Sequence, residues 1–442
     1  MLLSLVLLLQ AAAPIDPWQE RLAFAAPEGT AISTYVFSPD GSRVGVQVHD
    51  GTSLQLYLDG EPVDKDGHDY WAGPIFSPDG AHVAWAFGDD KGRDKEKWEV
   101  HQDGKKVASH DWAGGLTMAE DGTLAYWAGK GVKKAESGWY EGGKYTLMVG
   151  KKKKGETRQI PPAGQVVLGP KGELLAHATL DQGYMLYTGK EEHGPYMWVS
   201  GITASANGRS LAWCVSAIPG MDDGDTALDP FAGGGMGLPS SRGEVYLDGE
   251  LVSLPEDEAV TAPRLNRDGK RLAYIAQRNG KVTVVWRGKA WATTAGDASS
   301  PAISPDGKKV AVVFDHQVAT ASAGLTMLNT NWLDGGMEAS FGPDGSIAMR
   351  VADGDCRVMI DDEQVAGPFK RAIAPVWSPD SKQVAVRVQE EEGWRVAVGG
   401  HLSELYEEVG PPRFDEQGTK VAFGARKGQE LHWVLMELTG EE

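Results

Sequence analysis

The side chains best suited to binding chemistry lie in one long segment, residues 216–243, between two apolar runs. Four aspartates within eight residues are followed there by a glycine run with two large apolar side chains. They are Asp222, Asp223, Asp225 and Asp229, then Phe231 and Met236. Oxygen-rich loops suit Ca²⁺, but this spacing does not match an EF-hand. We therefore favour a solvated acidic loop over a Ca²⁺ site and expect no cofactor.

A second segment, residues 129–143, offers two adjacent aromatic side chains, Trp139 and Tyr140. Such rings suit contact with a partner or a sugar, because they combine a large apolar surface with a polar tip. The predicted partner-binding residues are therefore Trp139, Tyr140, Asp222, Asp223, Asp225, Asp229, Phe231 and Met236. No catalytic residue and no metal ligand is assigned.

The common catalytic signatures are missing from this chain. It has no His-Glu-x-x-His, Walker or Gly-x-Gly-x-x-Gly motif, and its ten histidines are scattered. Most carboxylates sit in turns, where aspartate has a conformational role. The favoured hypothesis is a non-catalytic protein. The rival hypothesis is a carbohydrate-active hydrolase or lyase, which would need carboxylates from several repeats to converge in a central channel.

The elements that position these segments belong to a repeat. Its marker is a turn, Phe37-Ser38-Pro39-Asp40-Gly41 in the first copy, followed by a short apolar strand. Ten copies follow one another at a typical spacing near 38 residues. A period of this length indicates a propeller or solenoid, in which no repeat buries its apolar face alone.

Each repeat predicts four short strands, which is one propeller blade. The second strand carries a small residue in every copy, at Gly45, Ala84, Ala125, Ala176, Ala212, Ala273, Ala311, Ala348, Ala385 and Ala422. We expect an all-β propeller of about ten four-stranded blades over residues 14–442. Residues 21–25 predict a strand that completes the last blade and closes one ring. Two smaller fused propellers are the alternative.

Four repeats are long because of extra residues between their second and third strands. The extra residues span about 87–97, 129–143, 216–243 and 315–324. In a propeller these connections emerge on one face, and loops on a rigid scaffold commonly carry function. The sequence therefore predicts a protein-binding or peptide-binding platform on that face.

The sequence Phe-Ser-Pro-Asp-Gly, followed by Val-Ala-x, resembles the TolB-type β-propeller repeat. The same repeat occurs in the propellers of prolyl-oligopeptidase-like enzymes. The resemblance covers roughly residues 30–438. It implies the fold and a role as a binding platform, but no catalytic residue. We expect neither the N-terminal α/β domain of TolB nor a hydrolase domain, whose Gly-x-Ser-x-Gly elbow is absent.

The net charge limits the classes of partner, and the positions of the two cysteines indicate their environment. The formal net charge is −19, which argues against a nucleic-acid partner, since that needs clustered positive charge. The basic run Lys151–Lys154 falls where a hairpin turn is expected, and we interpret it as a solvated turn rather than a polyanion contact. Cys214 and Cys356 lie in repeats that are not neighbours, so both are expected to be small buried hydrophobes.

The first residues suggest export. Residues 1–13 form a short apolar stretch that resembles a signal peptide, and no other run is long enough to span a membrane. We expect a periplasmic or secreted protein with a protein or peptide partner and no integral membrane segment. A structural element of an envelope assembly is a third hypothesis. The sequence does not indicate an oligomeric state.

Overall fold

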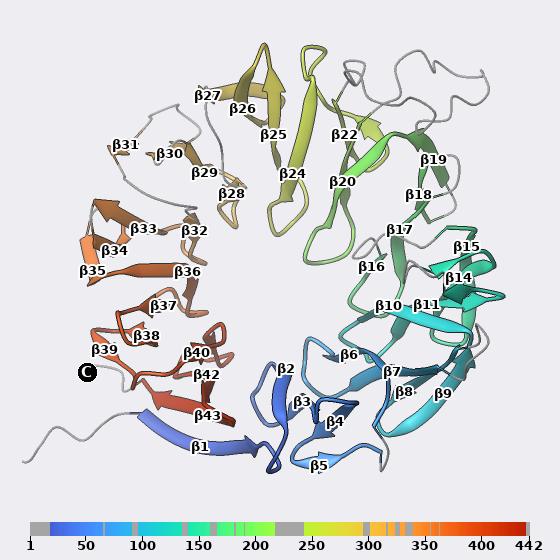
Figure 1. The fold of residues 1–442 in the computed structure, drawn as a ribbon. Helices are drawn as coiled ribbons and strands as arrows, with labels where there is room; N and C mark the ends of the chain where they lie inside the picture. Colours follow the sequence, from blue (N-terminus) through green and yellow to red (C-terminus); the bar gives the residue numbers. More distant parts are fainter. Residues whose placement is uncertain are drawn as a thin grey trace, which may run out of the picture.

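The computed structural model is a ring of antiparallel β-sheets around a central opening (Figure 1). It describes residues 18–64, 67–90, 96–134, 140–159, 166–180, 183–189, 191–216, 243–294, 301–314, 317–322, 328–331, 339–353, 355–361 and 363–438. Within these ranges every regular element is a β-strand. The chain is therefore an all-β propeller, as the repeat predicts.

The sheets follow the chain order. The first five comprise β2–β5 (Ala31–Phe37, Val44–His49, Leu54–Leu58, Glu61–Pro62), β6–β9 (Tyr70–Phe76, Val83–Asp90, Glu96–Gln102, Lys105–His110), β10, β11, β14 and β15 (Trp112–Met118, Leu124–Lys130, Lys144–Val149, Lys152–Thr157), β16–β19 (Val166–Leu168, Leu174–Leu180, Tyr184–Thr188, Glu191–Tyr196) and β20–β23 (Trp198–Ala204, Leu211–Ser216, Gly243–Leu247, Glu250–Leu251). A separate hairpin joins β12 (Lys133–Lys134) to β13 (Tyr140–Glu141).

The remaining sheets complete the circle. They comprise β24–β27 (Ala259–Leu265, Leu272–Arg278, Lys281–Trp286, Lys289–Thr294), β28–β31 (Ala302–Ile303, Lys309–Phe314, Gln317–Ser322, Leu328–Asn331), β32–β35 (Ala339–Phe341, Ile347–Asp353, Asp355–Ile360, Glu363–Phe369), β36–β39 (Arg371–Trp377, Val384–Gln389, Trp394–Val398, His401–Leu402) and the last sheet, with β40–β43 (Glu408–Val409, Arg413–Phe414, Lys420–Lys427, Glu430–Glu437) and β1 (Trp18–Ala25). Among the described strands, nine sheets have four strands, one has five and one has two. The count of about ten blades stays a prediction of the repeat.

The two ends of the chain meet in the last sheet. Strand β1 pairs with β43 from Trp18 opposite Met436 to Ala25 opposite Glu430. The predicted closing strand is therefore confirmed. Figure 1 shows the sheets around one opening, as expected for a single ring rather than two fused ones. Pairing the first strand with the last removes an open edge that would otherwise invite aggregation.

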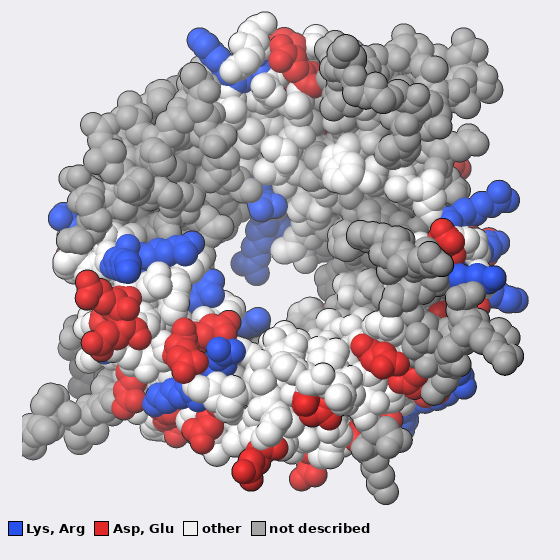
Figure 2. Space-filling view, in the orientation of Figure 1, with Lys and Arg blue, Asp and Glu red and all other residues white. Residues whose placement is uncertain are grey.

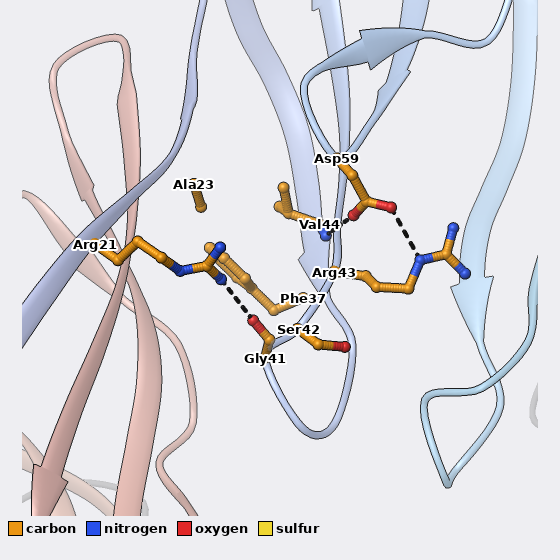
Figure 3. A pocket seen from close by; sticks show the side chains of 8 residues that line it. All are labelled: Arg21, Ala23, Phe37, Gly41, Ser42, Arg43, Val44 and Asp59. Carbon is orange, nitrogen blue, oxygen red and sulfur yellow. Dashed lines mark hydrogen bonds and ion pairs between the residues drawn. The ribbon is translucent and has the colours of Figure 1, made fainter.

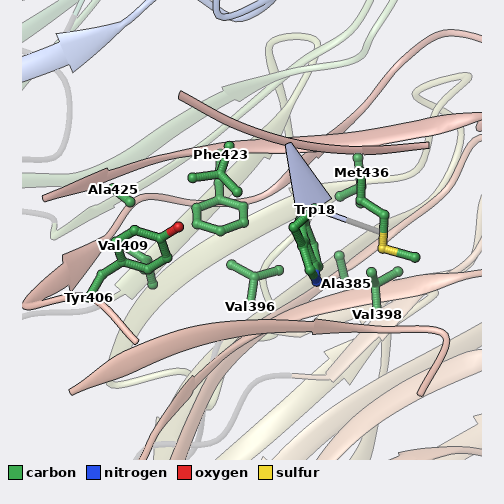
Figure 4. Packing of buried hydrophobic residues seen from close by; sticks show 11 residues of the cluster. Trp18, Ala385, Val396, Val398, Tyr406, Val409, Phe423, Ala425 and Met436 are labelled. Carbon is green, nitrogen blue, oxygen red and sulfur yellow. The ribbon is translucent and has the colours of Figure 1, made fainter. Parts of the chain in front are cut away.

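The core lies between successive sheets, as the close-up of the last two shows (Figure 4). Trp18 of β1 meets the ring of Phe423 edge-on, with ring centroids 5.5 Å apart. Both side chains belong to a buried cluster that also contains Ala385 and Val396 from the preceding sheet. The closing strand thus contributes apolar packing as well as backbone hydrogen bonds.

The repeated small residues of the second strands lie at one level of the ring. Most of the alanines have no exposed surface, and Ala422 is 8% exposed. Gly45 shows why they are small: an added Cβ would overlap the ring of Pro74 in the next sheet. The packing role predicted for these residues is confirmed at this level.

One predicted insertion is wrong. Residues 315–324 were expected to be an extended connection, but Gln317–Ser322 form the third strand β30. Strands β29 and β30 pair from Phe314 opposite Gln317. The strand escaped sequence analysis because Val318 is its only large apolar side chain, which leaves the period-two pattern weak.

Candidate binding surface

The strands end on two faces of the ring. We define the turn face as the one with the turns between first and second strands and the hairpins between third and fourth strands. The insertion face, opposite, carries the connections between second and third strands and those from one sheet to the next. The two faces use their polar and aromatic residues differently.

The repeated serine and aspartate of the turn face are engaged within their own turns. Ser38 Oγ donates a hydrogen bond to Asp40 (2.6 Å) and accepts one from the N–H of Arg43 (2.9 Å). Equivalent serine–aspartate pairs are Ser77–Asp79, Ser304–Asp306 and Ser378–Asp380. Hydrogen bonds from these serines and from nearby backbone N–H groups hold the pKa values of Asp79, Asp306 and Asp380 below the usual range. We therefore assign these carboxylates a structural role.

The turn glycines pack against the preceding sheet. At Gly41, an added Cβ would overlap the indole of Trp433. Seven further turn glycines similarly face a side chain of the previous repeat: Gly80, Gly122, Gly172, Gly208, Gly269, Gly307 and Gly418. Arg21 Nη2 also donates to the carbonyl of Gly41 (3.2 Å), beside a cavity of about 60 Å³ (Figure 3). That cavity belongs to the seam between the last sheet and the first, and it is too small for more than a few waters.

The insertion face carries a row of aromatic rings across the second and third repeats. Tyr70 stacks on Trp98 with ring centroids 6.2 Å apart, and Trp98 lies 6.5 Å from Trp112. Trp112 in turn lies 6.1 Å from Tyr140. Three of the four rings are only half-buried, and Trp98 is buried. These rings stand at strand ends that lead into the connections of this face.

Trp198 is the most exposed aromatic ring among the large hydrophobic side chains of the described residues, at 52%. It begins β20 and pairs with Ser216, the last residue before the longest connection. Its ring meets Tyr184 of the preceding sheet edge-on, with centroids 4.9 Å apart. An exposed indole combines a large apolar surface with a polar N–H, which suits contact with a partner.

Polar networks tie the insertion ends of neighbouring sheets together. Buried Asp257, in the connection to β24, accepts hydrogen bonds from Tyr274 Oη (2.9 Å) and Arg278 Nε (2.5 Å). Burial and the Asp257 charge raise the pKa of Tyr274 well above its usual value. His68 makes a similar link, with Nδ1 2.7 Å from Asp89. Within the described ranges, no three His, Cys, Asp or Glu side chains are placed to hold a metal ion.

Of the eight predicted binding residues, only Tyr140 lies within the described part of the chain. It is half-buried and extends the aromatic row through Trp112. Outside the described residues lie Trp139, Asp222, Asp223, Asp225, Asp229, Phe231 and Met236. Trp198 is not among the residues predicted from the sequence. Its signal was available, because it starts the strand whose partner strand leads into the longest insertion.

The central opening offers little for carboxylate catalysis. Among the described innermost strands the only carboxylate is Glu408, which lies 4.0 Å from the guanidinium of Arg426. Glycoside hydrolysis commonly needs two carboxylates flanking the scissile bond. The described inner wall therefore gives no support to a channel-carboxylate enzyme. Cys214 and Cys356 are buried, as expected.

No protein-family model matches the chain, and no curated protein matches its sequence. Solved structures do resemble it. The structure of a eukaryotic initiation factor has a TM-score of 0.49 and 12% identity, over 88% of this chain and 91% of that one. The Dos1 propeller has a TM-score of 0.38 and 12% identity, over 96% of both chains. TolB from Acinetobacter baumannii has a TM-score of 0.29 and 14% identity, over 60% of this chain and 80% of that one. At such low identities these likenesses concern the fold alone.

Proposed function

We propose that this chain is a non-catalytic binding platform that holds a protein or peptide through its insertion face. The observation that carries the proposal is Trp198, an indole more than half exposed on the end of a strand. Its sheet is fixed on both sides by buried clusters, so the ring is presented from a rigid support. Such aromatic anchors dominate many protein interfaces.

The aromatic row supports the same assignment. Tyr140, Trp112 and Tyr70 present half-buried rings on this face, in the repeats that precede Trp198. A partner that covers Trp198 and reaches this row would bury several rings without ordering a flexible backbone. Because such rings have few rotatable bonds, the entropy lost on binding is small. The predicted residues of 216–243 would add contacts at the edge of this surface.

The first test compares two exposed apolar residues. Trp198→Ala should reduce capture of partners from an envelope fraction by immobilised protein, measured by quantitative mass spectrometry. Leu251→Ala is the control, since Leu251 is 48% exposed in the same sheet but follows a hairpin of the turn face. Equal capture by both variants would contradict the proposal.

The second test removes the longest connection. Replacing residues 219–240 with a short Gly-Ser linker should leave the ring folded, because these residues lie outside the repeat. Partner capture should fall while circular dichroism and thermal unfolding stay unchanged. If the linker variant captures the same partners as the wild type, residues 219–240 have no part in binding.

Export and a periplasmic or secreted location belong to the same proposal. They rest on residues 1–13, which lie outside the described residues. In the described ranges no helix is long and apolar enough to cross a membrane. Cell fractionation, with N-terminal sequencing of the mature protein, tests both points. No described residue favours a catalytic or purely structural envelope role over the binding platform.

A further inference from the structure

One position of the innermost strands can be compared across the whole ring. It is the residue paired with the small residue of the second strand, two positions before the turn. The pairing places there Val36, Ile75, Thr117, Val167, Thr203, Arg264, Ala302, Ser340, Val376 and Arg413. Eight of these side chains are uncharged. The fold therefore does not need a charge at this level.

The two exceptions, Arg264 and Arg413, are both exposed. Neither makes a hydrogen bond or ion pair with the part of the chain that the structure describes. Their strands are the innermost of their sheets, so their side chains meet the solvent of the central opening. Figure 2 shows Lys and Arg side chains reaching into that opening. Positive charge gathers here although the whole chain carries −19.

The repeat that contains Arg264 departs from the pattern a second time, in its turn. Arg267 stands where Pro39, Pro78 and Pro305 stand in other turns, and it too is exposed. It lines an open hollow of about 420 Å³ on the turn face, together with Ala206, Asn207, Asp268 and Pro305. Arg267 thus lines the hollow, and Arg264 lies three positions before it, on the innermost strand β24.

The polar groups around the hollow leave room for an anion. Asp268 is already engaged, because it accepts the N–H of Lys270 (3.0 Å) and lies 3.8 Å from that ammonium group. Asn207 accepts two hydrogen bonds through Oδ1, from Ser205 Oγ and the N–H of Arg209. Its amide nitrogen, which can only donate, makes no hydrogen bond within the described residues. Guanidinium and amide donors together match a carboxylate.

We propose that an acidic peptide segment binds here, with one carboxylate held by Arg267 in the turn-face hollow and another by Arg264 on the adjoining innermost strand. Carboxylates fit because arginine pairs with them through two parallel hydrogen bonds. A nucleic acid fits poorly, because its binding needs a broad cluster of positive charge, whereas this site offers two arginines on a chain of net charge −19. The site lies on the face opposite Trp198, so it goes beyond the proposed function and does not depend on it.

The test uses a labelled hexaglutamate peptide, with hexaglutamine as the neutral probe, in fluorescence anisotropy at low salt. The double variant Arg264→Val with Arg267→Pro restores residues that other repeats carry at these positions, so it should fold. Its affinity for hexaglutamate should fall about tenfold or more, since charge-assisted bidentate hydrogen bonds are lost. Unchanged thermal unfolding confirms that the ring is intact.

A matched control removes the same number of charges elsewhere. Lys152→Gln with Lys153→Gln on the exposed strand β15 should leave hexaglutamate affinity within about twofold of the wild type, because ion pairs of solvated surface lysines contribute little. Trp198→Ala should also leave it unchanged, which separates this site from the insertion face.

Four results would overturn the proposal. They are no binding of hexaglutamate by the wild type, equal binding of hexaglutamine, an equal loss in the lysine control, or tighter binding of a single-stranded oligonucleotide of matched charge. Competition by inorganic phosphate at concentrations equal to the peptide would likewise assign the hollow to small anions rather than to a peptide.

Discussion

The turn face and the insertion face are built from the same strands, yet they follow opposite rules. On the turn face the repeat uses small residues and fixed polar pairs, so that Gly41 packs on Trp433 and Ser38 binds Asp40. On the insertion face large rings fill the strand ends, and one of them, Trp198, stays exposed. Residues of the turn face therefore hold the sheets of the ring together, whereas residues of the insertion face are less constrained by packing between sheets.

This difference has a geometric cause. Near the turns, each sheet approaches its neighbour closely enough that only glycine or alanine fits at the shared level. A larger side chain at this level would have to displace both of the sheets that pack together there. At the insertion ends of the second and third repeats, the rings of Tyr70, Trp98 and Trp112 occupy the space between the sheets. Sensitivity to substitution should therefore differ sharply between the two faces.

The largest effect is expected for Gly41→Ala. Gly41 has a positive φ of 67°, and its added Cβ would overlap Trp433. The left-handed backbone costs about 1–2 kcal/mol for alanine, and overpacking adds about 1–3 kcal/mol. The control is Gly51→Ala on the insertion side, where φ is 95° but no atom lies within 4 Å of the added Cβ. Chemical unfolding that gives equal losses for both variants would show that the close packing at Gly41 is unimportant.

Ala385→Leu should come next. Ala385 has no exposed surface and lies in the cluster that joins the last two sheets. Three added carbons have no space there, so we expect a loss of about 1–3 kcal/mol or more. Ala25→Leu, at the exposed insertion end of β1, adds the same atoms and should change stability little. The measurement is the denaturant concentration at the midpoint of unfolding for each variant. If Ala385→Leu and Ala25→Leu both unfold at the wild-type midpoint, the packing argument is wrong.

A smaller effect with a pH signature is expected for Ser378→Ala. Buried Ser378 donates to Asp380 (2.7 Å) and accepts the N–H of Gln383 (2.9 Å). Losing both bonds should cost about 1–2 kcal/mol at pH 7. The serine hydrogen bond is the main cause of the lowered pKa of Asp380. A lowered carboxyl pKa stabilises the fold above the ordinary pKa, and this contribution is lost as pH falls through the folded value.

The difference between wild type and Ser378→Ala should therefore shrink between about pH 5 and pH 2, where carboxyl groups with lowered pKa values titrate. Urea unfolding at pH 7 and at pH 3 measures it. A difference that stays constant or widens at pH 3 would mean that the ionised form of Asp380 gains nothing from Ser378.

The same contrast explains what sequence analysis could and could not predict. The turns and the small residues of the second strands recur in each repeat, and the N-terminal strand supplies the strand that the last repeat lacks. These features can therefore be predicted from a single sequence. A departure from the repeat cannot be interpreted from the sequence alone. The replacement of a turn proline by Arg267 gains a proposed role only when the structure shows the hollow beside it. The exposure of Trp198 depends on which side chains surround it, and strand β30 was missed because its residues are small.

The smallest stability effect is expected for Trp198→Ala, although this substitution removes the most atoms. More than half of the indole already faces solvent, and its described ring contact is the one with Tyr184. Losing one edge-on aromatic contact should cost about 0.5–1.5 kcal/mol, no more than deleting the single hydroxyl of Ser378. Comparing the free energies of unfolding of the two variants therefore tests the whole contrast between the faces. If Trp198→Ala proves as destabilising as Ala385→Leu, the indole is part of the core, and the insertion face loses its anchor for a partner.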